Sequence, residues 1–234
     1  MLTLMKTRPG LTVNQLKIIA MITMTCDHVG LYLLPQFPIL RVLGRLALPI
    51  YAYMIAQGCR HTHDRKRYLL RLLGLGLLCQ VVYYAVMGSL YQCILITFSL
   101  SLILIYAVDV ARKRCGPGTV LLALGVFFGE VFLCQILPEL LPETDFAVDY
   151  GILGVLLPVL VYLGETRWQE IGLLGAGLAT LAVSSGGIQW WSLGALLLLA
   201  LYNGRKGVYP IGKLFYLYYP LHLVVIYGIG WLIG

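Results

Sequence analysis

The sequence has little charge. Of its 234 residues, 12% are Asp, Glu, Lys or Arg and 60% are hydrophobic, whereas soluble globular domains carry about 25% charged residues. Apolar runs of roughly 17 to 25 residues, the length of a membrane-spanning helix, follow one another along the chain. This shortage of charge excludes an ordinary soluble domain and indicates an integral membrane protein.

Several motifs of common enzymes are also absent. The sequence contains no GxSxG elbow, no P-loop and no HExxH pair. Its six cysteines form no CxxC pair, so we expect apolar packing rather than a disulfide framework or a zinc site. His61 and His63 are close together but lack an obvious third ligand, and we expect no metal.

The net charge of +7 does not indicate a nucleic-acid partner. The basic residues gather in short turns between apolar runs, and no nucleic-acid-binding module is recognisable. Short loops rich in Lys and Arg are typical of the cytoplasmic face of a membrane protein. We therefore expect this chain to lie in the lipid bilayer and to have no nucleic-acid partner.

The apolar runs predict an all-α, polytopic helix bundle that forms one membrane domain over residues 1–234. We expect about nine spans, with eight to ten acceptable, and no internal repeat. The predicted spans cover residues 14–34, 39–58, 68–87, 92–111, 119–137, 148–164, 170–183, 190–202 and 213–233.

The positive-inside rule gives this bundle an orientation. With nine spans and a cytoplasmic N-terminus, the basic turns at 60–71, 112–114 and 205–206 all fall on the cytoplasmic face. The acidic loop 138–145 then falls outside. The first apolar run is too long for a signal-peptide core, so we expect a retained first span in a cell membrane, most simply a bacterial inner membrane.

Ionisable residues inside the apolar runs are the main functional clue. Asp27 and His28 are adjacent in the first span, and Arg41 and Arg45 lie four residues apart in the second. Such residues are costly in lipid and are candidates for a functional site. Rise per residue places them in the outer half of the membrane, together with Glu130 and Asp149 from later spans. His222, in the Pro220-containing last span, lies near the same depth. Glu130 is also interpretable as polar packing.

Histidine, carboxylate and arginine together suit acyl transfer. A histidine near a carboxylate can act as a general base, and an arginine can stabilise an oxyanion or hold a phosphate. Adjacent helix residues point in different directions, so Asp27 and Asp149 are rival partners for His28. Arg41 could instead reach the interface, and Arg45 could be a structural partner of either carboxylate.

Four segments of the sequence resemble the TraX family. They are LKIIAMITMTCDHVG (16–30), LRVLGRLALPIYAYMIAQGCRHTHDRKRYLLRL (40–72), DYGILGVLL (149–157) and FYLYYPLHL (215–223). The family is named for a conjugation protein that acetylates the N-terminus of F-type pilin. It is similar to the wider membrane acyltransferase-3 clan, which uses acyl-CoA donors, a first-span histidine and membrane-embedded arginines.

The resemblance implies an acetyl-CoA-dependent acetyltransferase. His28 would be the base, Asp27 would support it, and Arg41 and Arg45 would contact the acyl donor or the oxyanion. Asp149 and His222 fall in the other two segments as further catalytic candidates. The acceptor would be an amine or hydroxyl of an unidentified peptide, glycan or small molecule. Candidates for binding the CoA phosphates, if they do not merely signal topology, are Arg60, Arg65, Lys66, Arg67 and Arg71.

A second function class uses the same residues. Intramembrane Asp, His and Arg also form proton relays in small transporters and channels. Inverted repeats would favour that class, and the sequence has none. Cleavage of acetyl-CoA by the purified protein distinguishes the two.

Overall fold

The structure is a computed structural model that describes residues 10–207 and 211–233, with the side chains of 212–216 and 233 left aside. Residues 1–9, the N-terminal segment that we expect in the cytoplasm, lie outside the described residues. Every regular element in the described ranges is a helix, and the only β-pairing there is two isolated bridges. The predicted all-α class is therefore confirmed.

The chain divides into two compact units. The first combines residues 1–51 with 185–234, and the second comprises residues 52–184. The helix α3 (Ala47–His61) contains the boundary between them. The expectation of one domain over residues 1–234 stays a prediction.

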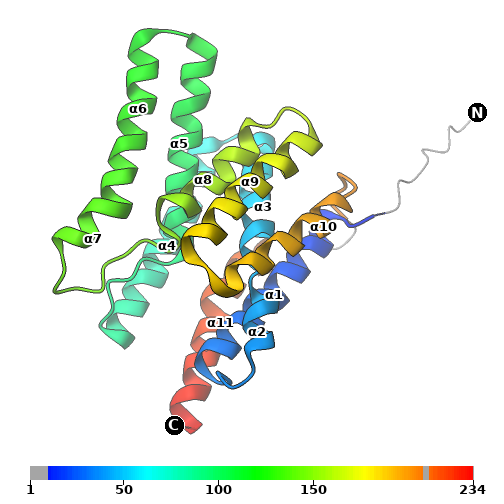
Figure 1. The fold of residues 1–234 in the computed structure, drawn as a ribbon, viewed down its shortest axis with the longest axis vertical. Coiled ribbons are helices and arrows are strands. Elements are labelled where there is room, and N and C mark those ends of the chain that lie inside the picture. The colour runs from blue at the N-terminus through cyan, green and yellow to red at the C-terminus, as the bar shows by residue number, and fades with distance from the viewer. Residues whose placement is uncertain (1–9, 208–210, 234) are drawn as a thin grey trace, which may run out of the picture. The chain divides into compact units, whose positions relative to one another are not determined.

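The first unit is built around α1. In Figure 1, α1 and α11 run alongside each other, and α2 packs against α1. A 3₁₀ helix, η2, packs against α2 and continues into α10. Besides the beginning of α3, the elements of this unit are α1 (Val13–Tyr32), α2 (Pro38–Gly44), η2 (Gly187–Gly194), α10 (Ala195–Ala200) and α11 (Gly212–Ile233).

The start of α1 is set by a capping box. The Thr12 hydroxyl accepts from the Gln15 backbone N–H at 3.3 Å, and the Thr12 backbone N–H donates to Gln15 Oε1 at 2.8 Å. These bonds satisfy two backbone N–H groups that a free helix end would leave unpaired. The cap fixes where the helix bearing Asp27 and His28 begins.

The second predicted span, 39–58, is not one uninterrupted helix. It consists of α2 and α3, with a turn at Arg45 and Leu46 between them. Pro49 has no backbone N–H to donate to the carbonyl of Arg45, four residues earlier. On the other side of this break, the Arg45 backbone N–H still donates to the carbonyls of Arg41 and Val42 in α2. Arg45 therefore sits at the end of α2 rather than in the middle of a regular helix.

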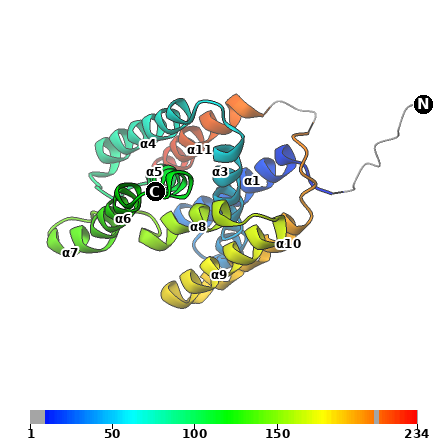
Figure 2. The ribbon, with the colours of Figure 1, turned by 90° about the horizontal axis from the view of Figure 1, so that it is seen from above.

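The second unit is centred on α5. Figure 2 shows α5 beside α4 and α6, and α5 also packs against α8. Pro138 cannot donate to the carbonyl of Cys134, and the helix there takes a wider π-helical turn, η1. The elements of this unit are α4 (Arg65–Met87), α5 (Ile94–Arg114), α6 (Pro117–Val131), η1 (Phe132–Ile136), α7 (Leu137–Leu140), α8 (Gly151–Leu163) and α9 (Arg167–Ser185).

Each of the nine predicted spans coincides with a helical segment, but only part of the count is confirmed. By length and hydropathy, 4 helical segments of the described chain are able to cross a membrane: Pro38–His61, Arg65–Met87, Ile94–Arg114 and Pro117–Leu140. Shorter apolar helices cover Gly151–Leu163, Gly187–Ala200 and Leu217–Leu232. A membrane protein is thus supported, while the number nine and the orientation stay predictions.

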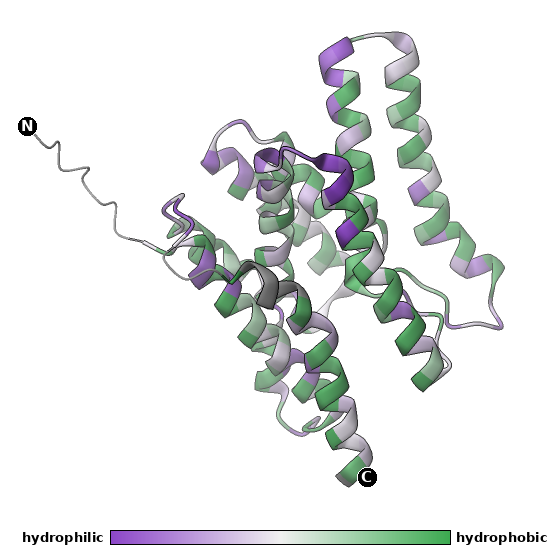
Figure 3. Cartoon of the chain, turned by 180° about the vertical axis from the view of Figure 1, so that it is seen from behind, coloured by the Kyte–Doolittle hydropathy of each residue, from purple (hydrophilic) through white to green (hydrophobic). Residues whose placement is uncertain are grey.

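Hydropathy follows the helices of the second unit. Figure 3 shows α5 and α6 hydrophobic over most of their length, and hydrophilic residues where α5 ends. That end carries Arg112, Lys113 and Arg114 in its last turn. Cations are favourable at a helix C-terminus because they oppose the negative end of the helix dipole.

Candidate functional site

Asp27 joins α1 to the end of α2 through two arginines. Arg41 Nη1 donates to Asp27 Oδ2 at 2.7 Å, and Arg45 Nη2 donates to Asp27 Oδ1. Gly44 makes this approach possible, since a Cβ there would lie 2.3 Å from the Cβ of Asp27. Of the two carboxylates that the sequence offered as partners of Arg45, Asp27 is the one that it contacts, and Arg41 faces the same carboxylate.

This ion-pair cluster is largely shielded from solvent. The side chains of Arg45 and Asp27 are 9% and 16% exposed, and that of Arg41 is 25% exposed. Two guanidinium groups share one carboxylate, so the three residues carry a net positive charge. Such a charge can attract an anion or stabilise negative charge that develops on an oxygen.

His28 does not bond to its neighbour Asp27. Its Nδ1 atom lies 3.0 Å from the carbonyl oxygen of Met24 and 3.2 Å from Nε2 of His222. The Asp27 carboxylate is occupied by the two arginines instead. The expectation that Asp27 directly supports His28 is not what the geometry shows, because successive residues of a helix point about 100° apart.

The partners of the two histidines determine which ring atom carries a proton. His222 Nδ1 lies 3.0 Å from the carbonyl of Tyr218, which can only accept, so that nitrogen is protonated in the neutral ring and Nε2 is an acceptor. His28 Nδ1 then carries the proton that faces Met24 and His222. This assignment leaves Nε2 of His28 as the basic nitrogen.

Aromatic side chains surround this histidine pair. The ring of Tyr218 stacks on His222, and that of Tyr32 is parallel to His28. The hydroxyls of Tyr218 and Thr25 are hydrogen-bonded to each other, which ties α11 to α1. His222, 6% exposed, is thus held at a fixed position beside His28.

Gln189 is a polar residue of this site that sequence reasoning missed. Arg45 Nη1 donates to its Oε1 atom at 3.3 Å. Gln189 lies in η2, one residue before the predicted span 190–202 begins. The polar pair Gln189 and Ser192 within the apolar run IQWWSLG is the signal that could have indicated it.

Asp149 belongs to the second unit and has partners there. Its Oδ1 accepts from the Tyr91 hydroxyl at 2.8 Å, and its backbone N–H donates to the carbonyl of Gln92. In the same loop region the Ser89 hydroxyl, with the N–H of Leu90, lowers the pKa of the Asp145 carboxyl. These contacts join the loop after α4 to the loop before α8.

Glu130 also lies in the second unit, on α6. It is 5% exposed, and neither carboxylate oxygen has a hydrogen-bond partner within the described ranges. The expectation that Glu130 and Asp149 share a membrane layer with His28 stays a prediction.

Two of the five candidate phosphate-binding residues are held in ion pairs that join different helices. Arg60 pairs with Glu170 and also donates to three carbonyls at the end of α8. Arg65 donates to Asp109 at 2.6 Å and to the Tyr162 hydroxyl at 3.3 Å. These bonds give both arginines a role in joining helices of the second unit, a role that the sequence did not indicate.

The other three cations lie together at the beginning of α4. Lys66, Arg67 and Arg71 line a hollow of about 320 Å³ with Asp64 and Leu70. Arg67 also forms an exposed pair with Asp64 at 3.3 Å. This basic hollow is of the right chemistry for phosphate oxygens.

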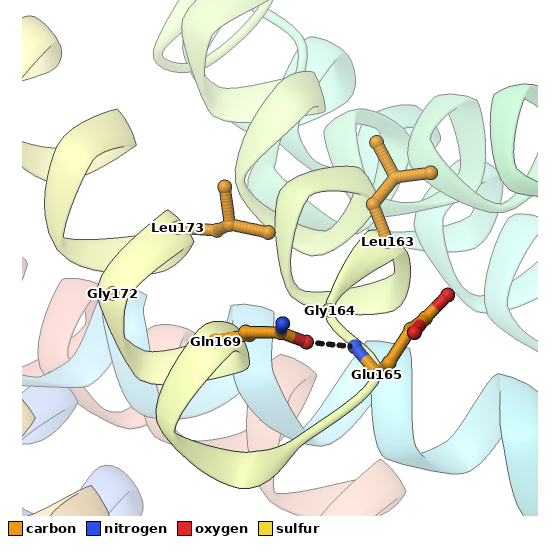
Figure 4. Close-up of a pocket in the computed structure, with 6 residues that line it drawn as sticks. All are labelled: Leu163, Gly164, Glu165, Gln169, Gly172 and Leu173. Carbon is orange, nitrogen blue, oxygen red and sulfur yellow. Dashed lines mark hydrogen bonds between the residues drawn. The ribbon is translucent and has the colours of Figure 1, made fainter.

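A second hollow lies between the end of α8 and the beginning of α9. Its volume is about 490 Å³, and Leu163, Gln169 and Leu173 are among its lining residues. Figure 4 shows Gln169 turned toward Glu165, whose backbone N–H donates to Gln169 Oε1 at 3.0 Å. No nucleophilic side chain lies beside a base among its lining residues.

Within the part of the chain that the structure describes, no group of three or more His, Cys, Asp or Glu could hold a metal ion.

Comparisons with known proteins extend over most of the chain. The chain is 27% identical over 241 residues to "Probable fimbrial assembly protein FimC, serogroup H1" of Dichelobacter nodosus, covering 91% of this chain and 93% of that protein. It is 50% identical over 38 residues, 16% of this chain and 15% of that protein, to "Uncharacterized protein RP591" of Rickettsia prowazekii (strain Madrid E). No solved structure matches. The profile of the family described as TraX protein matches residues 12–230, so this chain belongs to the TraX family.

Proposed function

We propose that this protein is a membrane-embedded acetyltransferase that moves an acetyl group from acetyl-CoA to an amine of an extracytoplasmic or membrane acceptor. A hydroxyl acceptor would use the same groups. The observation that carries the proposal is the orientation of His28, whose Nδ1 is engaged by Met24 and His222 while Nε2 is left as a base. Asp27, the residue before His28, holds Arg41 and Arg45 in ion pairs, and the three side chains together carry a net positive charge.

In the proposed reaction His28 Nε2 accepts a proton from the acceptor nitrogen as that nitrogen attacks the thioester carbon. The new C–N bond forms, the carbonyl electron pair moves to oxygen, and it returns as the C–S bond breaks. The proton held by His28 goes to the departing thiolate, so the products are an amide and CoA. The net positive charge of the Arg41–Arg45–Asp27 cluster stabilises the oxyanion electrostatically.

The basic hollow on α4 is the proposed contact for the phosphates of acetyl-CoA. Lys66, Arg67 and Arg71 line it, whereas Arg60 and Arg65 are committed to ion pairs with Glu170 and Asp109. The predicted orientation puts this hollow on the cytoplasmic side, where acetyl-CoA is made.

The acceptor proposed here is the amino group of an exported protein. The Dichelobacter nodosus relative is named as a fimbrial assembly protein, and the name favours a protein acceptor over a glycan or a small molecule for a first test. The proposed location is a bacterial inner membrane. A distant common origin with the acyltransferase-3 clan is part of the same proposal.

The decisive experiment measures release of CoA thiol from acetyl-CoA by the purified, reconstituted protein, with and without a peptide that has a free N-terminal amine. We expect slow release alone and faster release with the peptide, together with acetylation of its amine by mass. His28→Ala should abolish release while the protein keeps its thermal stability. His63→Ala is the matched control, since His63 lies on the exposed turn before α4.

Two outcomes would contradict the proposal. Full activity in the His28→Ala variant would remove the proposed base. Proton flux into liposomes without any cleavage of acetyl-CoA would favour the alternative of a small proton-coupled transporter or channel.

A further inference from the structure

Two buried polar side chains face the same way on the 3₁₀ helix of the first unit. Gln189 and Ser192 are three residues apart in η2, and their exposed fractions are 4% and 0%. Side chains at i and i+3 of a 3₁₀ helix eclipse one another because it has three residues per turn. Trp190 and Trp191, between them, are 47% and 60% exposed and point elsewhere.

The contact with Arg45 orients the Gln189 amide. A guanidinium group can only donate, so the atom that it faces at 3.3 Å is the amide oxygen, Oε1. The amide nitrogen Nε2 therefore points away from Arg45. Within residues 10–207 and 211–233, neither Gln189 Nε2 nor Ser192 Oγ has a hydrogen-bond partner.

Buried polar atoms without partners are rare in folded proteins, and each one calls for an explanation. Here two occur one turn apart, next to the buried residue Arg45. An amide NH₂ has only protons to offer, and a hydroxyl can also donate. The Gln189 amide, the Ser192 hydroxyl and the Arg45 guanidinium therefore offer hydrogen-bond donors. Such a set fits a ligand with an acceptor oxygen and does not fit a cation.

We propose that Gln189 Nε2 and Ser192 Oγ, beside Arg45, bind the carbonyl oxygen of the acyl thioester. This inference rests on the proposed function and deepens it by assigning the donors that contact the reacting carbonyl. Asp27 links them to the base, since it pairs with Arg45 and is next to His28 in α1.

The electron balance of acyl transfer explains the use of such donors. When the acceptor nitrogen bonds to the thioester carbon, the carbonyl electron pair moves to oxygen, and it returns when the C–S bond breaks. The acceptor's proton goes through His28 to the thiolate, so none is needed from Gln189 or Ser192. Their N–H and O–H groups remain in place and bond more strongly to the charged oxygen than to the carbonyl.

The test compares binding of acetyl-CoA with binding of S-ethyl-CoA, a thioether of similar size that lacks the carbonyl oxygen. Affinities are measured for the wild type, Gln189→Met and Ser192→Ala. Gln36→Met and Ser185→Ala are controls at exposed positions. We expect the wild type and the controls to bind acetyl-CoA roughly tenfold more tightly, about the effect of one hydrogen bond. Each of the two variants removes one of the two donors, so its ratio should fall clearly below that of the wild type.

Thermal stability separates loss of the site from loss of the fold. Ser192→Ala removes a buried hydroxyl that has no partner, so its melting temperature should equal or exceed that of the wild type. Gln189→Met also removes the Oε1 atom that accepts from Arg45, so its melting temperature should fall by a few degrees without loss of the folded state. Turnover should fall in both variants, with kcat affected more than the KM for acetyl-CoA, since the bonds strengthen in the transition state.

The outcomes distinguish this inference from the proposed function. Unchanged affinity ratios and turnover in both variants, with an active wild type, would overturn the assignment and leave the acetyltransferase standing. Those results would mean that the two side chains bond only to a buried water molecule. A wild type that neither binds nor cleaves acetyl-CoA would overturn both proposals together.

Discussion

Asp27 and His28 are adjacent in the chain but have separate partners. Asp27 faces Arg41 and Arg45 on α2, and His28 faces His222 on α11. On a helix of 3.6 residues per turn, successive side chains differ by about 100° in direction. One pair of residues can therefore serve two functions, a charge cluster and a base, without direct contact.

Replacement of Asp27 by Asn tests the charge cluster. The variant leaves Arg45, 9% exposed, without a counter-charge. Removing one partner of a largely buried ion pair costs roughly 3–5 kcal/mol, so a clear fall in melting temperature is expected in detergent. Glu139→Gln is the control, an exposed acid of α7. An equal melting temperature for Asp27→Asn and wild type would contradict a structural role for the cluster.

His222 is expected to act as a positioning residue for His28. His222→Leu removes the acceptor that faces the Nδ1–H of His28, so His28 loses one of the two contacts that fix its tautomer. By analogy with outer partners of histidine ligands, turnover should fall roughly 10–100-fold, with little change in the KM for acetyl-CoA.

The conservative variant His222→Asn provides the contrast, since its amide oxygen can accept the same hydrogen bond. It should recover part of the turnover, and the pH–rate profile of His222→Leu should be displaced from that of the wild type. Equal rates for the Leu and Asn variants would mean that His222 only fills space.

At the scale of elements, irregular helices position the site. Pro49 ends α2 at Arg45, and η2 is a 3₁₀ helix where an α-helix was expected. In the second unit a single buried carboxylate joins α3, α8 and α9. Glu170 accepts from the Tyr53 hydroxyl, from Gln57 Nε2 and from Arg60, which in turn donates to carbonyls at the end of α8.

Glu170→Gln tests how much this junction contributes. The substitution removes the charge that holds Arg60. This pair is largely shielded from solvent, since the side chains of Glu170 and Arg60 are 7% and 24% exposed. We expect a loss of about 3 kcal/mol in the free energy of unfolding, measured by thermal or denaturant unfolding in detergent. The matched control is Glu165→Gln, whose pair with Arg112 is 76% and 49% exposed and should contribute at most about 1 kcal/mol. The reverse order of effects would contradict the proposed junction.

At the scale of the whole molecule, membership of the TraX family and the apolar helices agree on a membrane protein. The orientation depends on which side carries the basic turns. Cys115, directly after the three basic residues at the end of α5, is a free cysteine with an exposed side chain that a thiol reagent can reach. It is therefore a natural reporter of sidedness.

A variant that retains Cys115 as its sole cysteine tests the predicted orientation. In spheroplasts of a bacterial host, a membrane-impermeant maleimide should not label Cys115 until the membrane is permeabilised, because the turn is expected in the cytoplasm. Glu143→Cys, in a variant without native cysteines, is the opposite control and should be labelled from outside. Labelling of Cys115 in intact spheroplasts would reverse the orientation and place the basic hollow on the wrong side for cytoplasmic acetyl-CoA.

The sequence by itself determined the class of the protein and most of its helices. Composition and run length are enough for this, since each apolar run must satisfy its own backbone hydrogen bonds in lipid. The residues Asp27, His28, Arg41, Arg45 and His222 were also identifiable, because ionisable groups inside apolar runs are rare. The pairing of Arg45 with Asp27 was among the alternatives that the sequence left open.

Only the tertiary structure decided which of these residues touch. It placed His222, rather than a carboxylate, beside His28, committed Asp27 to two arginines, and brought Gln189 to Arg45 across 144 positions of the chain. It likewise assigned Arg60 and Arg65 to ion pairs with Glu170 and Asp109. Local periodicity carries no information about such contacts, because they depend on how helices distant in the chain pack and in which direction each side chain points.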